Sequence, residues 1–154
     1  MELLVIRHAK AEEHGHPGGD AARALVAKGR KQAERLGAFL LRIGRVPDIT
    51  LTSPLVRARQ TAEILCTAAA AAEPVVQPWL ACGMDPDTAR RELTAFTSFA
   101  RIAIVGHEPD LSLLLIALLG ADAGTIEVKK ASVTALEIDG RRARLLFHVP
   151  PALI

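Results

Sequence analysis

The chain has 154 residues, of which 50% are hydrophobic and 23% charged, and its formal net charge is +2. This length and composition argue against intrinsic disorder and predict one domain over residues 1–154 with a core of its own. Only 3% of the residues are aromatic, so no stacking platform for single-stranded nucleic acid is expected, and the small net charge favours no nucleic-acid partner.

The first element in the chain is a short hydrophobic run, residues 3–6, typical of a strand buried on both faces. It has no preceding positive region and leads directly into Arg7, which predicts a strand rather than a signal peptide. Cys66 and Cys82 are too few for a disulfide framework and are interpreted as reduced thiols. The hydrophobic stretch 111–119 has about half the length that spans a bilayer and predicts a buried helix. A cytoplasmic protein with no membrane partner is expected.

A polar, glycine-containing loop is expected over residues 9–20. The hydrophobic spacing that follows predicts a helix to about Arg42, with Gly29 in its first turn. A second strand is expected over residues 49–52. Ser53 and Pro54 then look like the N-cap and the first-turn proline of a helix.

The second half of the chain continues the alternation of strands and helices. We expect a short strand at 75–76, a helix over 86–99, a buried strand over 102–105 and a Leu-rich helix that begins at Pro109 and Asp110. Two further strands, over 132–138 and 143–149, flank the hairpin signal Asp139-Gly140. This order predicts an α/β fold. We expect a three-layer sandwich with a mostly parallel central sheet, helices on both faces and a C-terminal antiparallel hairpin.

Positively charged or ionisable residues follow three of the predicted strands. Arg7 and His8 come after the first strand, Arg57 lies in the first turn of the helix after the second, and His107 follows the strand over 102–105. Ligands of open α/β sheets bind at the carboxyl ends of the strands, so these side chains are expected to converge. Two Arg and two His at one rim favour a compact multivalent anion, and phosphate is the obvious ligand.

These residues lie in segments that resemble the three signature segments of the histidine phosphatase superfamily, in the same order: Arg7-His8-Ala9, the run from Ser53 to Ala62 (SPLVRARQTA), and Gly106-His107. The short chain, the segment 7–11 and the segment 106–111 are similar to the SixA-type phosphohistidine phosphatase branch of that superfamily. The resemblance implies a hydrolase of signal transduction whose substrate is a phosphorylated protein.

The resemblance also implies a role for each site residue. His8 is expected to be the nucleophile that carries the phosphoryl group, and Arg7, Arg57 and His107 are expected to bind and stabilise it. Arg23 resembles a further phosphate-binding arginine of the SixA-type branch. No metal ion and no cofactor is expected.

The chain departs from the superfamily pattern in three respects, one of which is Val26 where Thr is common. Ala9 stands where most members have Gly, and no carboxylate near Trp79 matches the usual general acid. The carboxylates that remain as possible proton donors are Glu108, Asp85 and Glu12, with Glu108 the first to test.

Other residues favour less specific interpretations. His14 and His16 resemble a metal pair but have no third ligand, so they are interpreted as solvated loop residues. Neither cysteine has an Arg six positions later, so the Cys-x5-Arg phosphatase loop is absent.

Three functions remain open at this point. The first is a protein phosphohistidine phosphatase. The second is a phosphomonoesterase of the same superfamily that acts on small molecules. The third is a non-catalytic phosphate-binding module, which predicts the loss of the nucleophile or of an arginine, whereas His8, Arg7, Arg57 and His107 are all present.

Overall fold

The computed structural model describes residues 1–140 and 142–154, and its strands form a six-stranded sheet in the order β3-β2-β4-β1-β5-β6. The strands are β1 (Glu2–Arg7), β2 (Ile49–Thr52), β3 (Val75–Val76), β4 (Arg101–Gly106), β5 (Val133–Asp139) and β6 (Arg142–Val149). Strands β1 to β4 are parallel, whereas β5 runs antiparallel to both β1 and β6. The predicted mixed sheet with its C-terminal hairpin is confirmed.

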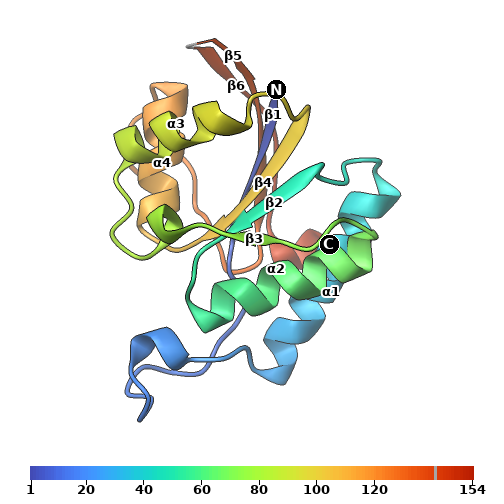
Figure 1. Cartoon of the computed structure of the whole chain (residues 1–154), viewed down its shortest axis with the longest axis vertical. Helices are drawn as coiled ribbons and strands as arrows, with labels where there is room; N and C mark the ends of the chain where they lie inside the picture. The colour runs from blue at the N-terminus through green and yellow to red at the C-terminus, as the bar shows by residue number, and fades with distance from the viewer. Residues whose placement is uncertain (141) are drawn as a thin grey trace.

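Helices cover both faces of this sheet, as Figure 1 shows. They are α1 (Ala27–Arg42), α2 (Val56–Ala69), α3 (Pro86–Leu93) and α4 (Asp110–Leu119). Because side chains alternate along a strand, Leu4 and Ile6 of β1 pack with α1 and α2, while Leu3 and Val5 pack with α3 and α4. Each face of the sheet thus has its own buried hydrophobic cluster between the strands and the helices. The fold is the three-layer sandwich that the sequence predicts.

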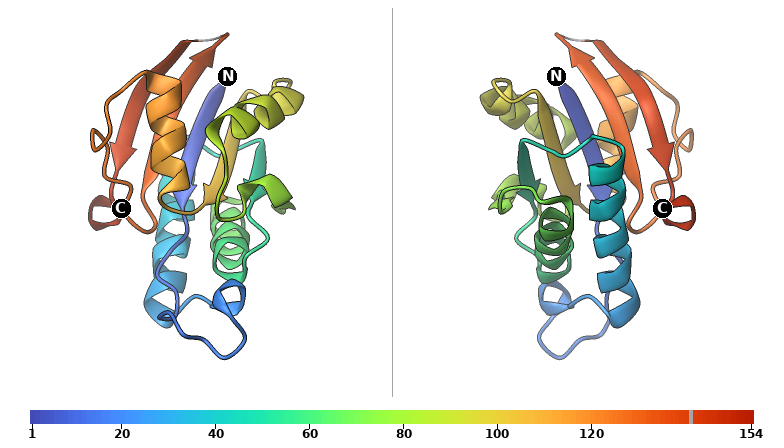
Figure 2. Two further views of the ribbon diagram at one scale, coloured as in Figure 1. Left: turned by 90° about the vertical axis from the view of Figure 1, so that its left-hand side faces the viewer. Right: turned by 90° about the vertical axis from the view of Figure 1, so that its right-hand side faces the viewer.

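The loop between β1 and α1 extends beyond the ends of α1 and α2, at the bottom of both views in Figure 2. It is stabilised by an isolated antiparallel bridge between Ala11 and Leu25 and by a short 3-10 turn, Asp20–Ala22. Gly29 lies in the first turn of α1, as predicted. A Cβ atom there would come within 1.9 Å of the Lys10 carbonyl oxygen, so α1 begins directly against the backbone that follows His8.

The helix predicted over 86–99 is shorter than expected. Helix α3 ends at Leu93 and is followed by a 3-10 turn, Thr94–Phe96. The hydroxyl of Thr94 donates to the Arg91 carbonyl at 2.6 Å, and that of Thr97 donates to the Thr94 carbonyl at 3.1 Å. Side chains that bond to nearby backbone groups compete with the helical hydrogen-bond pattern, which explains the early end.

The predicted start of the second helix is also wrong. Helix α2 begins at Val56, with Leu55 as an N-cap that has no side-chain hydrogen bond, so Pro54 lies before the helix. The backbone N–H of Ser53 still donates to Val105 of β4 at 3.0 Å, which keeps Ser53 in line with the sheet. Its side chain is therefore available for a different contact, described below.

Helices α1 and α2 approach each other closely at Gly37, where a Cβ atom would lie 2.4 Å from the Leu65 carbonyl oxygen. We expect Gly37→Ala to lower the free energy of unfolding by about 1–3 kcal/mol, because overpacking against a backbone atom outweighs the better helix propensity of Ala. Thermal or urea unfolding checks this. Ala38→Leu, on the exposed side of the same helix, is the control and should leave the midpoint nearly unchanged. An unchanged midpoint in Gly37→Ala would show that the helices can move apart freely.

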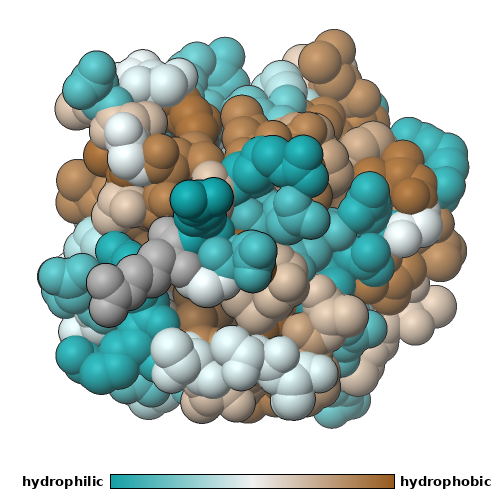
Figure 3. All heavy atoms as spheres, turned by 90° about the horizontal axis from the view of Figure 1, so that it is seen from above, coloured by the Kyte–Doolittle hydropathy of each residue, from teal (hydrophilic) through white to brown (hydrophobic). Residues whose placement is uncertain are grey.

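Figure 3 looks from above onto the end of the molecule opposite the 9–22 loop, where hydrophobic and hydrophilic residues are interspersed.

Helix α4 is the Leu-rich segment, and its Leu111, Leu114 and Leu115 side chains are buried, as expected for a core helix. Within residues 1–140 and 142–154, no helix combines the length and the apolar composition needed to cross a membrane.

Candidate active site

Two histidines meet at the carboxyl ends of β1 and β4. The strands pair in register from Glu2 with Arg101 to Arg7 with Gly106, so His8 and His107 are the next residues of each. The His8 N–H donates to the Gly106 carbonyl at 3.0 Å, and the two ring centroids lie 5.2 Å apart. The convergence expected from the sequence is therefore present.

The His8 ring has one defined tautomer. Its Nδ1 lies 2.8 Å from the Ala9 carbonyl oxygen, and because a carbonyl only accepts, Nδ1 carries the proton. Burial, with the nearby charges of Arg57 and Arg7, lowers the pKa of His8 to about 3, so the ring is neutral near pH 7. The Ala9 N–H donates to Thr61 Oγ1 at 3.0 Å, which holds this backbone in place. Nε2 of His8 thus has a free lone pair, as a nucleophile requires.

His107 is held by Ser53, the residue that the sequence suggested as a helix cap. Nε2 of His107 lies 2.7 Å from Ser53 Oγ, which also accepts the Leu55 N–H at 3.2 Å. Burial, followed by the charge of Arg57, lowers the pKa of His107 to about 4. In the free protein the His107 ring is therefore neutral near pH 7. If the Ser53 hydroxyl donates to Nε2, the ring proton lies on Nδ1, and His107 remains a donor without being charged.

Arg7 and Arg57 are each fixed along one side. Nη1 of Arg7 donates to the Val128 carbonyl at 2.8 Å. Nη1 and Nη2 of Arg57 donate to the Asp20 carbonyl at 2.8 Å and to Asp20 Oδ2 at 3.0 Å. Among the described residues, Nε of either arginine and Nδ1 of His107 are buried nitrogens with no hydrogen-bond partner. Donor groups in this state can bind the oxygens of an anion.

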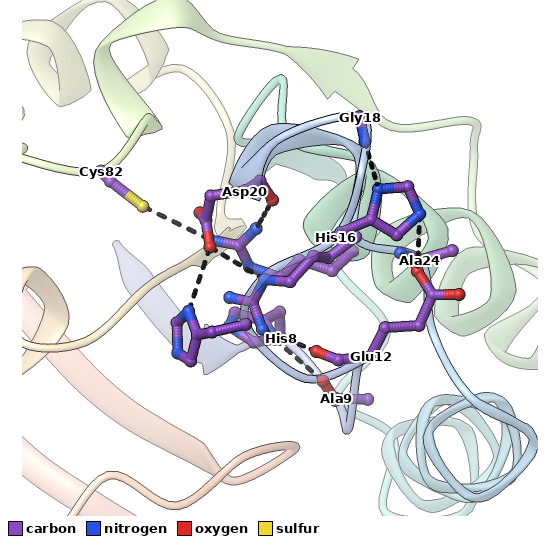
Figure 4. A network of polar contacts seen from close by, with 11 residues as sticks. His8, Ala9, Glu12, His16, Gly18, Asp20, Ala24 and Cys82 are labelled. Carbon is purple, nitrogen blue, oxygen red and sulfur yellow. Dashed lines mark hydrogen bonds and ion pairs between the residues drawn. The ribbon is translucent and has the colours of Figure 1, made fainter.

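Arg23 joins the same network through Asp20, which Figure 4 shows among the polar contacts. Its Nε donates to Asp20 Oδ1 at 2.8 Å, and its Nη1 donates to the Glu12 carbonyl at 2.7 Å. The Arg23 side chain is only 8% exposed and that of Arg57 only 3%, whereas the Asp20 carboxylate is 50% exposed. Asp20 therefore links the two buried guanidinium groups from the solvent side.

The three candidate proton donors all have other contacts. Both carboxylate oxygens of Glu108 accept from Ser112, one from its N–H at 3.1 Å and one from its hydroxyl at 2.5 Å. Asp85 caps α3 by accepting the Thr88 N–H at 2.8 Å. Glu12 Oε2 accepts the Ala24 N–H at 2.9 Å.

The remaining residues singled out in the sequence lie as follows. His14 and His16 each contact a different carboxylate. His14 Nδ1 lies 3.5 Å from Asp20 Oδ1, and His16 Nε2 lies 3.5 Å from Glu12 Oε2. Within the described part of the chain, no group of three or more His, Cys, Asp or Glu side chains is arranged to hold a metal ion. Cys82 is exposed as a residue, but its Sγ lies 3.6 Å from Arg57 Nη2, and partial burial of the thiol raises its pKa.

Sequence reasoning missed several residues that organise the site. Asp20 carries a weak signal, since it stands three residues before Arg23, a spacing at which the two side chains can meet on a tight turn. Ser53 was identified, but for a different role. Asp110 was assigned to the helix start, and it also accepts the N–H groups of Gly83 and Met84, at 2.8 and 3.1 Å. It thereby fixes the loop that carries Cys82.

The geometry defines an α/β protein in which two histidines and three arginines gather at the edge of the sheet where β1 and β4 end. His8, His107, Arg23 and Arg57 are buried, and Arg7 is half-buried. The family model described as histidine phosphatase superfamily (branch 1) matches residues 3–81. An uncharacterized protein of Picosynechococcus sp. is 34% identical over 152 residues, which cover 92% of this chain and 88% of that protein. The chain therefore belongs to the histidine phosphatase superfamily.

Solved structures agree with this assignment. The protein histidine phosphatase SixA in complex with tungstate has the same fold, with a TM-score of 0.91 and 19% identity over 99% of this chain and 98% of that one. The putative phosphohistidine phosphatase SixA from Agrobacterium tumefaciens has a TM-score of 0.86 and 25% identity, covering 97% of each chain. The fold and the family support a phosphatase.

Proposed function

We propose that this protein removes phosphoryl groups from phosphohistidine on proteins, through a covalent intermediate on His8. The observation that carries the proposal is the arrangement around His8. Its ring is neutral, and its Nδ1–H donates to the Ala9 carbonyl. Three neighbouring side chains each have a buried nitrogen with no hydrogen-bond partner among the described residues. Those side chains are Arg7, Arg57 and His107. The similarity to the two SixA structures supports the same substrate class.

In the proposed reaction, the lone pair on His8 Nε2 forms a bond to phosphorus while the bond to the leaving group breaks. The His8 ring becomes positive, and its Nδ1–H bond to the Ala9 carbonyl stabilises that charge. Water then attacks phosphorus, the bond to His8 breaks, and phosphate leaves. Arg7, Arg57 and Arg23 supply the positive charge that the transferring group needs, so we propose that the reaction requires no metal ion.

The substrate class follows from the leaving group. An alkyl phosphate ester must expel an alkoxide and benefits strongly from a positioned acid. Both oxygens of Glu108 accept hydrogen bonds from Ser112, so contacts within the chain hold this carboxylate at the start of α4. Phosphohistidine leaves as an imidazole, which can carry its own proton near neutral pH and needs less assistance. The site therefore fits a phosphoramidate better than an ester.

We expect kcat/KM for a phosphohistidine protein to exceed that for glycerol phosphate by at least about two orders of magnitude, with p-nitrophenyl phosphate in between, because its leaving group is also good. Steady-state kinetics on the three substrates measures this. Equal or better rates on glycerol phosphate that are lost in Glu108→Gln would instead identify a small-molecule phosphomonoesterase with Glu108 as its acid. Tight phosphate binding without turnover of any substrate would identify a binding module.

A further inference from the structure

Asp20 combines two properties that the proposed chemistry has not used. Its carboxylate is fixed on the Arg57 Nη2 at 3.0 Å and on the Arg23 Nε at 2.8 Å. Its side chain is 50% exposed, although both partners are almost fully buried. The carboxylate is therefore a rigid negative group on the solvent side of the arginines, the side from which a protein substrate approaches them.

The exposed side of this carboxylate already has an imidazole next to it. Nδ1 of His14 lies 3.5 Å from Asp20 Oδ1, and the His14 side chain is 84% exposed. In Figure 4 Asp20 lies above His8 in the same close view, with Cys82 to one side. An imidazole ring can thus approach Asp20 from solvent without displacing either arginine.

We propose that Asp20 determines specificity for phosphohistidine by accepting a hydrogen bond from the second ring nitrogen of the substrate histidine while His8 takes the phosphoryl group. This inference rests on the proposed function. The substrate ring enters with a proton on that nitrogen and with the phosphoryl group on the other. When His8 Nε2 bonds to phosphorus, the electron pair of the broken P–N bond returns to the substrate ring, which leaves as neutral imidazole. The positive charge passes to the His8 ring.

A carboxylate in this position favours the protonated substrate ring, since an opposite charge nearby stabilises the charged form. Asp20 can do so only while it is ionised. Its own partial burial opposes ionisation, but the charges and hydrogen bonds of Arg57 and Arg23 outweigh it and hold the pKa of Asp20 below its usual value. A phosphate ester has no corresponding N–H, so Asp20 offers it no such contact.

The decisive experiment is Asp20→Asn, measured on a phosphohistidine protein, on p-nitrophenyl phosphate and with inorganic phosphate as inhibitor. We expect kcat/KM for the phosphohistidine protein to fall roughly tenfold or more beyond any fall with p-nitrophenyl phosphate, the order of one charge-assisted hydrogen bond. The inhibition constant of phosphate should stay the same or become tighter, because the arginines lose a competing carboxylate. His14→Ala should leave the phosphohistidine rate unchanged or higher.

A matched control is Asp48→Asn, which removes an exposed carboxylate that accepts the Arg101 N–H at 2.7 Å, at the start of β4. It should leave the ratio of the two substrates unchanged. Parallel losses on both substrates in Asp20→Asn, with weaker phosphate inhibition, would overturn the inference and show that Asp20 only positions the arginines. A wild-type protein that hydrolyses p-nitrophenyl phosphate but no phosphohistidine would overturn the proposed function itself, and that result is visible before any variant is compared.

Discussion

His8→Ala is expected to lower kcat by a factor on the order of 10³ or more, because removal of a nucleophile eliminates the covalent route. Wild-type protein quenched without acid during turnover should carry one phosphoryl group on His8, labile to acid and stable to base. The structure also predicts the isomer. Since Nδ1 donates to the Ala9 carbonyl at 2.8 Å, phosphorus should be attached to Nε2. Mass spectrometry locates the residue, and phosphorus NMR distinguishes the two ring positions.

The control for this experiment is His16→Ala, a histidine of the 9–22 loop whose ring accepts the Gly18 N–H at 3.0 Å. It should retain activity and the label on His8. A fully active His8→Ala, or a phosphoryl group on Cys82, would contradict the mechanism. Exhaustive chelation should leave the wild-type rate unchanged, and loss of activity that a divalent cation restores would assign a metal-dependent reaction instead.

Arg57→Ala is expected to lower kcat/KM by about two to three orders of magnitude, equivalent to about 3–4 kcal/mol of transition-state stabilisation, the range for loss of one donor to a developing oxyanion. The Arg57 side chain is only 3% exposed, so solvent screens its charge weakly. Arg57→Lys should recover only part of the rate, because an ammonium group cannot reproduce contacts on two sides of a planar fork. Kinetics with p-nitrophenyl phosphate measures both variants.

Arg59 provides a matched control on the same helix. Its side chain is 50% exposed and pairs with Glu63 at 3.6 Å, so Arg59→Ala should change kcat/KM very little. Thermal unfolding of each variant separates loss of structure from loss of transition-state binding. Full activity in Arg57→Lys would mean that Arg57 provides only positive potential, and the fork geometry proposed for it would be wrong.

The sequence by itself determined the order of the strands and helices and the edge of the sheet at which the chemistry is concentrated. The buried strands around Leu3 and Ile104 are continuous hydrophobic runs, which only a sheet covered on both faces accommodates. Once parallel strands are expected, residues that follow them must meet at one edge. The sequence alone therefore groups Arg7, His8 and His107 at one edge of the sheet.

The tertiary structure alone decided which side chains of the site contact one another, because these contacts join residues far apart in the chain. The ion pair of Asp20 with Arg57 spans 37 residues, and the contact of Ser53 with His107 spans 54. Local patterns carry no information on such pairs, so Asp20 was overlooked and Ser53 was interpreted as a helix cap. The neutral state of both histidines has the same origin, since it depends on burial and on charges brought close only by the folded chain.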